Sequence, residues 1–162
     1  MNTNELIDNF VASVDPSGSI FQLIDDAPWI AVFEQRLPRR LPASFRSLVT
    51  RYSFAPFEAG RLSFYANRGI GDVEDLSVAI FRDKLIVDNT MKAGYIQFAR
   101  PATGDYDPIC FDANTAVSNR EFPIVRLDHE EILCYERIRV TEKVADSFYR
   151  FVADIVTNEK TI

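Results

Sequence analysis

The spacing of hydrophobic residues changes twice along this chain, and this change restricts the possible folds more than any other sequence feature. In three N-terminal segments, apolar residues recur three or four positions apart, which is the spacing of one helical face. Asp-Pro-Ser-Gly at 15–18 would end the first helix, Asp26 would cap the second, and Pro42 would begin the third. The three apolar faces comprise Ile7, Phe10, Val11 and Val14; Trp29, Val32, Phe33 and Leu37; and Phe45, Leu48, Val49 and Tyr52.

The middle of the chain instead favours strands. Leu62, Phe64 and Ala66 alternate with Ser63 and Tyr65, so they would lie on one side of a strand. A turn rich in Pro and Gly at 101–106 separates two further strand-like segments and predicts a hairpin. The stretch 73–92 combines helix-like and ambiguous spacing, and we predict a broken helix there. The expected strands cover residues 62–66, 95–99, 107–112 and 123–127.

The C-terminal segment returns to helical spacing. Thr141 would cap this helix, and Glu142 would lie favourably in its first turn. Its apolar face comprises Val144, Phe148, Phe151, Val152 and Ile155. The order of helices, then strands, then a helix predicts a single α+β domain over residues 1–162. Its mostly antiparallel sheet would be flanked by the N-terminal helices and the C-terminal helix.

Charge and hydropathy exclude several classes of protein. The formal net charge of −6 disfavours binding to the phosphate backbone of nucleic acids. An uninterrupted apolar run of about 18 residues is absent from the sequence, so we expect no membrane span. The N-terminus lacks the basic and apolar regions of a signal peptide, and Cys110 and Cys134 are too few for a disulfide framework. These features predict a cytoplasmic protein with free thiols.

The residue types that support catalysis or cofactor binding do not form a recognisable motif. His129 could act as a general base beside a carboxylate, or it could simply bond backbone groups where a strand ends. Cys110, between Ile109 and Phe111, reads as a core residue and not as a nucleophile. Gly69-Ile70-Gly71 has no phosphate-binding signature, so it reads as a loop. We therefore predict no catalytic residue and no cofactor.

Two acidic groups remain as candidates for binding, at residues 104–107 and 128–131. Asp105, Asp107 and Asp112 lack the spacing of a calcium loop, so no metal site is predicted. Gly-Asp-Tyr-Asp at 104–107 is nevertheless either a partner-binding turn or an ordinary polar turn. Arg36, Arg39 and Arg40 read as a solvated helix end. The candidate partner-binding residues are Asp105, Tyr106, Asp107, Asp112, Asp128, Glu130 and Glu131.

Four separated segments together resemble the SUKH superfamily, over roughly residues 25–156. Leu-Pro-Ala-Ser-Phe-Arg-Ser-Leu at 41–48 is similar to the helix entry of that family. Gly-Asp-Tyr-Asp-Pro-Ile-Cys-Phe-Asp at 104–112 is similar to its central glycine, Asp-Pro and strand. Pro123-Ile124-Val125, followed by Asp128-His129-Glu130, resembles its later strand and acidic turn. Ser147-Phe148 with Phe151-Val152 resembles its closing helix.

The resemblance implies an α+β fold without catalytic activity. Bacterial relatives are typically cytosolic immunity proteins that neutralise a cognate polymorphic toxin, often a nuclease or deaminase, and fungal relatives act as signalling adaptors. An acidic, partly aromatic surface would suit a toxin with a basic cleft. Two alternatives stay open: an adaptor that binds a different cellular protein, and a small hydrolase that uses His129.

Overall fold

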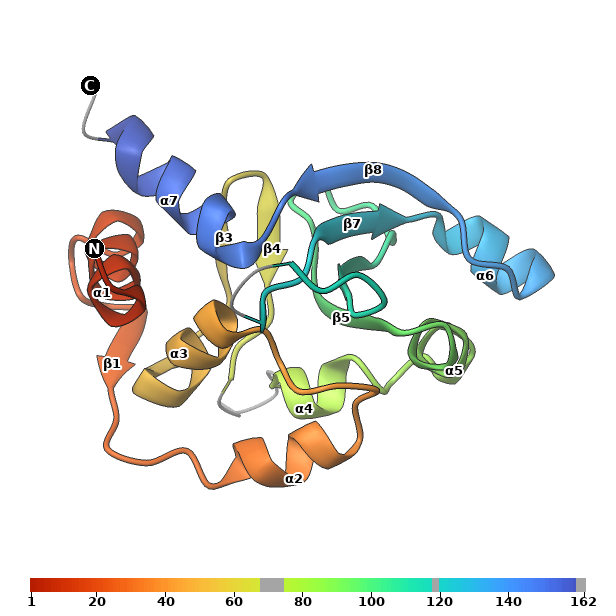
Figure 1. The fold of residues 1–162 in the computed structure, drawn as a ribbon, viewed down its shortest axis with the longest axis horizontal. Helices are drawn as coiled ribbons and strands as arrows, with labels where there is room; N and C mark the ends of the chain where they lie inside the picture. The colour runs from red at the N-terminus through yellow and green to blue at the C-terminus, as the bar shows by residue number, and fades with distance from the viewer. Residues whose placement is uncertain (68–74, 118–119, 160–162) are drawn as a thin grey trace.

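The computed structural model describes residues 1–67, 75–117 and 120–159 (Figure 1). Gly69-Ile70-Gly71 and the first part of the predicted broken helix at 73–92 lie outside these ranges. From residue 75 onward the break is confirmed, because α4 (Leu76–Ala79) and α5 (Lys84–Lys92) are separate helices. The Asp83 side chain caps α5 by accepting the backbone N–H of Ile86 at 3.3 Å.

A six-stranded antiparallel sheet runs through the molecule, and its strands follow one another in chain order. The predicted hairpin is confirmed, since Tyr95 pairs with Asp112 and Ile96 with Phe111. A second, two-stranded antiparallel sheet lies near the N-terminus. The large sheet comprises β3 (Phe57–Ala59), β4 (Leu62–Phe64), β5 (Tyr95–Pro101), β6 (Ile109–Asp112), β7 (Ile124–Leu127) and β8 (Val140–Ala145); the small one comprises β1 (Phe21–Leu23) and β2 (Tyr52–Phe54).

Helices cover both faces of the large sheet, which confirms the predicted α+β class. In Figure 1, α1 (Thr3–Val14), α3 (Ala43–Arg51) and α7 (Phe148–Glu159) lie to one side of the central strands, and α5 and α6 (His129–Tyr135) lie to the other. The remaining N-terminal helix, α2 (Trp29–Gln35), lies beside α4 at the lower edge of this view. Among the described helices, none combines the length and apolar character needed to cross a bilayer.

Successive side chains of each strand point to opposite faces of the large sheet, and they form two hydrophobic clusters, one on each face. Phe111 and Ile124 belong to the larger cluster, whereas their neighbours Cys110 and Val125 belong to the smaller one. The larger cluster is rich in aromatic rings, and Phe98 and Phe111 stack with their centroids 4.0 Å apart. The smaller cluster seats α5 and α6 through Ile86, Leu127 and Ile132.

Residues 140–145 form a strand, so the predicted helix start at Thr141 is wrong. This segment pairs with β7 as the edge strand of the sheet, and the pairing outweighs the local helical pattern. Helix α7 begins only at Phe148. Ser147 caps it, because its hydroxyl oxygen accepts the backbone N–H of Arg150 at 3.0 Å.

Three other N-terminal expectations also need correction. Helix α2 starts after Pro28, without a side-chain cap from Asp26. Val32, expected on its apolar face, is 64% exposed. Tyr52, expected on the third helix, instead follows α3 and begins β2, while Pro42 occupies the predicted position at the N-terminus of α3.

The buried carboxylate of Glu121 joins the N-termini of two helices. It accepts the backbone N–H of Ser44 in α3 at 3.1 Å and that of Tyr149 in α7 at 3.1 Å, and it also accepts the Ser44 hydroxyl. Helix N-termini favour negative charge because their first N–H groups have no partner within the helix. Glu121 therefore holds α3 and α7 together across the larger cluster.

Candidate functional site

Six of the seven predicted site residues gather where the β5–β6 connection meets the junction of β7 and α6. Because β6 and β7 are neighbouring strands, the loop that precedes β6 and the end of β7 lie at the same edge of the sheet. The backbone N–H of Leu127 donates to the Pro108 carbonyl oxygen at 3.0 Å and joins the two segments. We refer to residues 103–107 and 128–140 together as the α6 end of the molecule.

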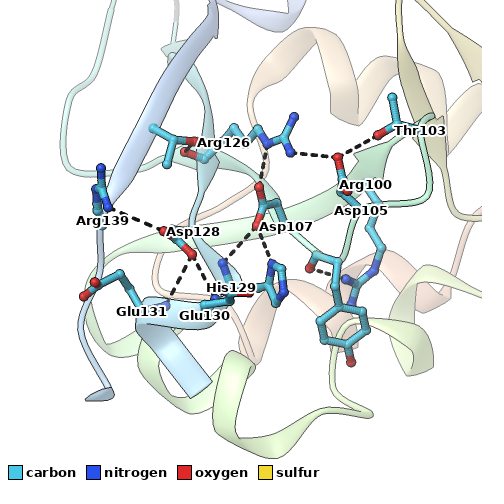
Figure 2. A network of polar contacts seen from close by, with 12 residues as sticks. Arg100, Thr103, Asp105, Asp107, Arg126, Asp128, His129, Glu130, Glu131 and Arg139 are labelled. Carbon is cyan, nitrogen blue, oxygen red and sulfur yellow. Dashed lines mark hydrogen bonds and ion pairs between the residues drawn. The ribbon is translucent and has the colours of Figure 1, made fainter. Parts of the chain in front are cut away.

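Asp107 is the centre of a polar network at the α6 end (Figure 2). Its carboxylate accepts the Arg126 Nε–H at 2.7 Å and the backbone N–H of His129 at 3.0 Å, and it lies 2.6 Å from His129 Nδ1. Burial raises the pKa of Asp107, but the bonds from His129 and Arg126 outweigh burial, so this pKa is below its usual value. Asp107 is thus a buried structural anion and not an exposed acidic contact.

Arg126 extends the network to the exposed loop. Its Nη2 group lies 3.1 Å from Asp105, whose carboxylate also accepts the Thr103 hydroxyl at 2.9 Å. The hydrogen bonds from Arg126 to Asp107 and Asp105 raise the pKa of Arg126. This one guanidinium therefore fixes residues 103–107 against β7 and neutralises part of the acidic charge at this end.

Tyr106 projects from the same loop and is 42% exposed. The Arg100 guanidinium lies 3.8 Å from the Tyr106 ring centroid, and the His129 ring meets the tyrosine ring edge-on at 5.7 Å. The hydroxyl donates to Asp83 at 2.9 Å. These contacts hold the tyrosine in one orientation. Less side-chain conformational entropy would therefore be lost when a partner binds.

Helix α6 begins at His129, so the expected strand-to-loop junction at this residue is wrong. Asp128 caps the helix by accepting the backbone N–H groups of Glu130 at 2.9 Å and Glu131 at 3.3 Å. Arginines partly balance the acidic cluster, because Arg139 lies 3.7 Å from Asp128 and Arg137 lies 3.4 Å from Glu131. Glu130 is exposed and has no ion pair among the described residues.

Asp112 lies apart from the other candidate residues, at the opposite end of β6. Its carboxylate accepts the backbone N–H of Asn114 at 3.1 Å and the side-chain amide of Asn114 at 3.0 Å. The same amide donates to the Ala93 carbonyl oxygen at 2.8 Å. Asp112 therefore orders the turn after β6 and does not contribute to the α6 end.

The α6 end also exposes apolar side chains that the sequence analysis did not single out. Leu133 is 38% exposed, Tyr135 63% and Val140 45%, in addition to Tyr106. Glu136, the residue that caps the C-terminus of α6, adopts a left-handed conformation with φ of 52°. A helix of seven residues has too few turns for its hydrophobic period to be recognised, which explains why this set was missed.

One group at this site could in principle hold a metal ion. Asp107, Asp128 and His129 each offer a ligand atom, and these atoms lie within 4.8 Å of one another. The Asp107 oxygens already bind His129 and Arg126, and Asp128 Oδ1 already caps α6. A cation would have to replace these bonds beside the Arg126 guanidinium. The geometry therefore favours a hydrogen-bonded structural cluster over a metal centre.

The pair of Asp107 and His129 resembles the orienting half of a general base, but a reactive partner is not evident. The His129 ring and its backbone N–H both bond to the Asp107 carboxylate. Cys110 is fully buried in the smaller cluster, and burial raises the pKa of its thiol. These positions support a structural role for His129 and a core role for Cys110.

Comparison with known proteins identifies a family for most of the chain. The model of the SMI1/KNR4 family (SUKH-1) matches residues 26–154. This range includes α2, α3, the entire large sheet and the α6 end, and it confirms the resemblance expected over residues 25–156. A search of curated proteins finds no match.

Proposed function

Because this chain belongs to the SMI1/KNR4 family (SUKH-1), we propose that it is a non-catalytic domain that binds another protein. We further propose that it is a cytosolic immunity protein and that its partner is a cognate polymorphic toxin domain, such as a nuclease or deaminase. The family membership supports protein binding in general. The identity of the partner rests on the typical role of bacterial relatives and on the surface described below.

The observation that carries this proposal is the combination of exposed apolar and acidic side chains at the α6 end. Four of the exposed large hydrophobic residues belong to this end: Tyr106, Leu133, Tyr135 and Val140. Aromatic residues beside apolar contacts are enriched in the parts of an interface that contribute most to affinity. The rigid setting of Tyr106, between Arg100 and His129, makes it a preformed contact.

Charge at the same end suits a basic partner. Residues 128–140 carry four carboxylates and two arginines, and these arginines already form ion pairs with Asp128 and Glu131. Of these carboxylates, Glu130 and Glu136 are exposed, and Asp105 adds a further exposed one beside the apolar side chains. A toxin that acts on nucleic acid carries a basic cleft, and an acidic surface would approach it rapidly and cover it.

The first test is a protection assay. Candidate toxin domains encoded by genes neighbouring this one would be expressed in a naive host with and without this protein. We expect this protein to restore growth and to co-purify with the toxin domain. Failure of both would contradict the immunity proposal and would favour the adaptor alternative, in which the same surface binds a different cellular protein.

A paired set of variants tests the surface. Glu130→Lys with Tyr135→Ala should weaken toxin binding by at least about ten-fold, because it reverses one exposed charge and removes one exposed ring at the α6 end. Asp25→Lys with Leu23→Ala makes a matched change at exposed residues near β1 and should leave affinity within about two-fold. Calorimetric titration gives both values. Equal effects of the two variants would place the interface elsewhere.

A further inference from the structure

Four arginines surround a cavity that is separate from the α6 end. Its volume is about 560 Å³, which lies in the range of ligand-binding pockets. The cavity is formed by the segment between α2 and α3, by α3 itself and by the segment between β6 and β7. The residues that matter here are Arg39, Arg40, Arg46 and Arg120 together with Leu41 and Phe122. Among the described residues that line it, none is acidic.

Arg36 is separated in the structure from Arg39 and Arg40. The sequence pattern had indicated that all three form a solvated helix end. Arg36 turns away, and its guanidinium lies 3.5 Å from the Phe81 ring centroid and donates to the Ser77 carbonyl oxygen. Arg39 and Arg40 instead line the cavity. Arg46 and Arg120 line the same cavity. The fold therefore brings together positive charges that are far apart in the sequence.

Much of this positive charge is unneutralised. Arg46 lies 3.1 Å from Glu34, whose carboxylate also accepts the backbone N–H of Leu41 at 3.0 Å. Among the described ion pairs, Arg39, Arg40 and Arg120 have no carboxylate partner. Three guanidinium groups on a protein of net charge −6 therefore remain available to an anionic ligand.

The cavity also has an apolar component. Leu41 and Phe122 line the cavity and belong to the larger hydrophobic cluster. They are 4% and 6% exposed, so they contribute a small apolar surface. Guanidinium groups pair with carboxylates through two parallel hydrogen bonds, and they also stack on aromatic rings. A ligand that carries carboxylates beside an aromatic or aliphatic group would use both components.

Two observations disfavour phosphate ligands. The net charge of −6 repels a nucleic acid, whose charge is dense and extended. Phosphate sites at helices usually depend on free backbone N–H groups, but here Glu121 already accepts the N–H of Ser44 in the first turn of α3. One of the backbone donors that a phosphate would use at this helix N-terminus is therefore already occupied.

We infer that this cavity binds an acidic segment of a protein partner, with glutamate or aspartate side chains next to an aromatic or aliphatic one. The inference goes beyond the proposed function, because it assigns a second interaction surface of opposite charge to that of the α6 end. It does not depend on the partner being a toxin.

Peptide selection tests this inference with the full chain. A random-sequence phage library would be selected for binding to the native protein, and the affinities of enriched peptides would be measured for the native protein and two double variants. Arg39→Gln with Arg120→Gln removes two charges from the cavity. Arg61→Gln with Arg150→Gln removes two exposed arginines elsewhere, with side chains 86% and 67% exposed, and serves as the matched control. Thermal unfolding would establish that both variants fold.

We expect enriched peptides to combine acidic and aromatic or aliphatic residues. Their affinity should fall at least about ten-fold in the cavity variant and less than about two-fold in the control. Selection of neutral or basic peptides, or equal losses in both variants, would overturn the inference. Inorganic phosphate provides a second arm: if it binds the native protein, loses binding in the cavity variant and displaces no peptide, the cavity is a small-anion site and the inference is wrong.

Discussion

Asp107 shows how a residue can look like a surface contact in sequence and be a structural anchor in the fold. Its carboxylate is neutralised by Arg126 and holds the first residue of α6 in place. Only the neighbours Asp105 and Tyr106 reach solvent. Within the acidic turn, Asp107 therefore stabilises the α6 end, whereas Asp105 and Tyr106 are accessible to a partner.

The depressed pKa of Asp107 gives a prediction with a defined pH dependence. Asp107→Asn should lower the free energy of unfolding by about 2 kcal/mol at neutral pH, because the charged hydrogen bonds are lost. A carboxyl whose pKa is lower in the folded state stabilises the protein above its unfolded pKa of about 4, and this contribution disappears as pH falls through the folded value. The difference between wild type and variant should thus be largest at neutral pH and vanish in acid.

Urea unfolding over a pH series measures this difference. Asp105→Asn is the control, because its side chain is 56% exposed and its ion pair should contribute less than about 1 kcal/mol. A difference between wild type and Asp107→Asn that is independent of pH would show that the ionised carboxylate is not the stabilising species.

At the level of secondary structure elements, Glu121 has an unusual position because one carboxylate serves two helices. Glu121→Ala should destabilise the protein by about 3 kcal/mol, since it leaves the buried N–H of Ser44 and the partly buried N–H of Tyr149 without an acceptor. Ser44→Ala removes only the hydroxyl bond and should cost about 1 kcal/mol. Chemical denaturation of both variants tests this order. An equal cost for the two would mean that the helix N-termini do not depend on Glu121.

The elements that could be predicted from sequence are those determined by contacts close along the chain. The first helix and the hairpin of β5 and β6 follow from local spacing and from the turn at residues 101–106. Strand β8 could not be predicted, because it is fixed by pairing with β7 and its own residues are mostly exposed. Helix α6 has a clear cap in Asp128 but too short an apolar pattern to be recognised.

The candidate site was predictable only in part, for the same physical reason. Six of the seven proposed residues do meet at the α6 end, because the loop before β6 and the end of β7 are adjacent. The network that organises them depends on Arg126, which lies 19 residues from Asp107 and carries no sequence signal. Glu121 and Ser44, 77 residues apart, are a still more distant pair.

On the scale of the whole molecule, charge is distributed unevenly despite the net value of −6. The α6 end is acidic and apolar, whereas the arginines of the cavity lie on α3 and on the segments before it and before β7. A protein with this distribution can present different surfaces to different partners. It can also orient itself in the electric field of a charged partner before contact.

This distribution predicts how association with a basic toxin domain responds to salt. Raising the ionic strength from about 0.01 M to about 0.15 M shortens the screening length from about 30 Å to about 8 Å. The association rate constant should fall by at least about ten-fold, while the dissociation rate constant changes little. Stopped-flow fluorescence measures both. An association rate that does not respond to salt would show that electrostatic attraction has no role in the encounter.

The position of β8 has a consequence for behaviour at high concentration. An edge strand presents unpaired backbone groups, and these can recruit a strand from another molecule and start aggregation. In β8 the exposed side chains include Glu142 and Lys143, and Lys143 forms an ion pair with Asp146 at 2.7 Å. Burying these charges against an incoming strand would be unfavourable. The charged side chains of β8 therefore disfavour edge-to-edge pairing between molecules at this edge of the sheet.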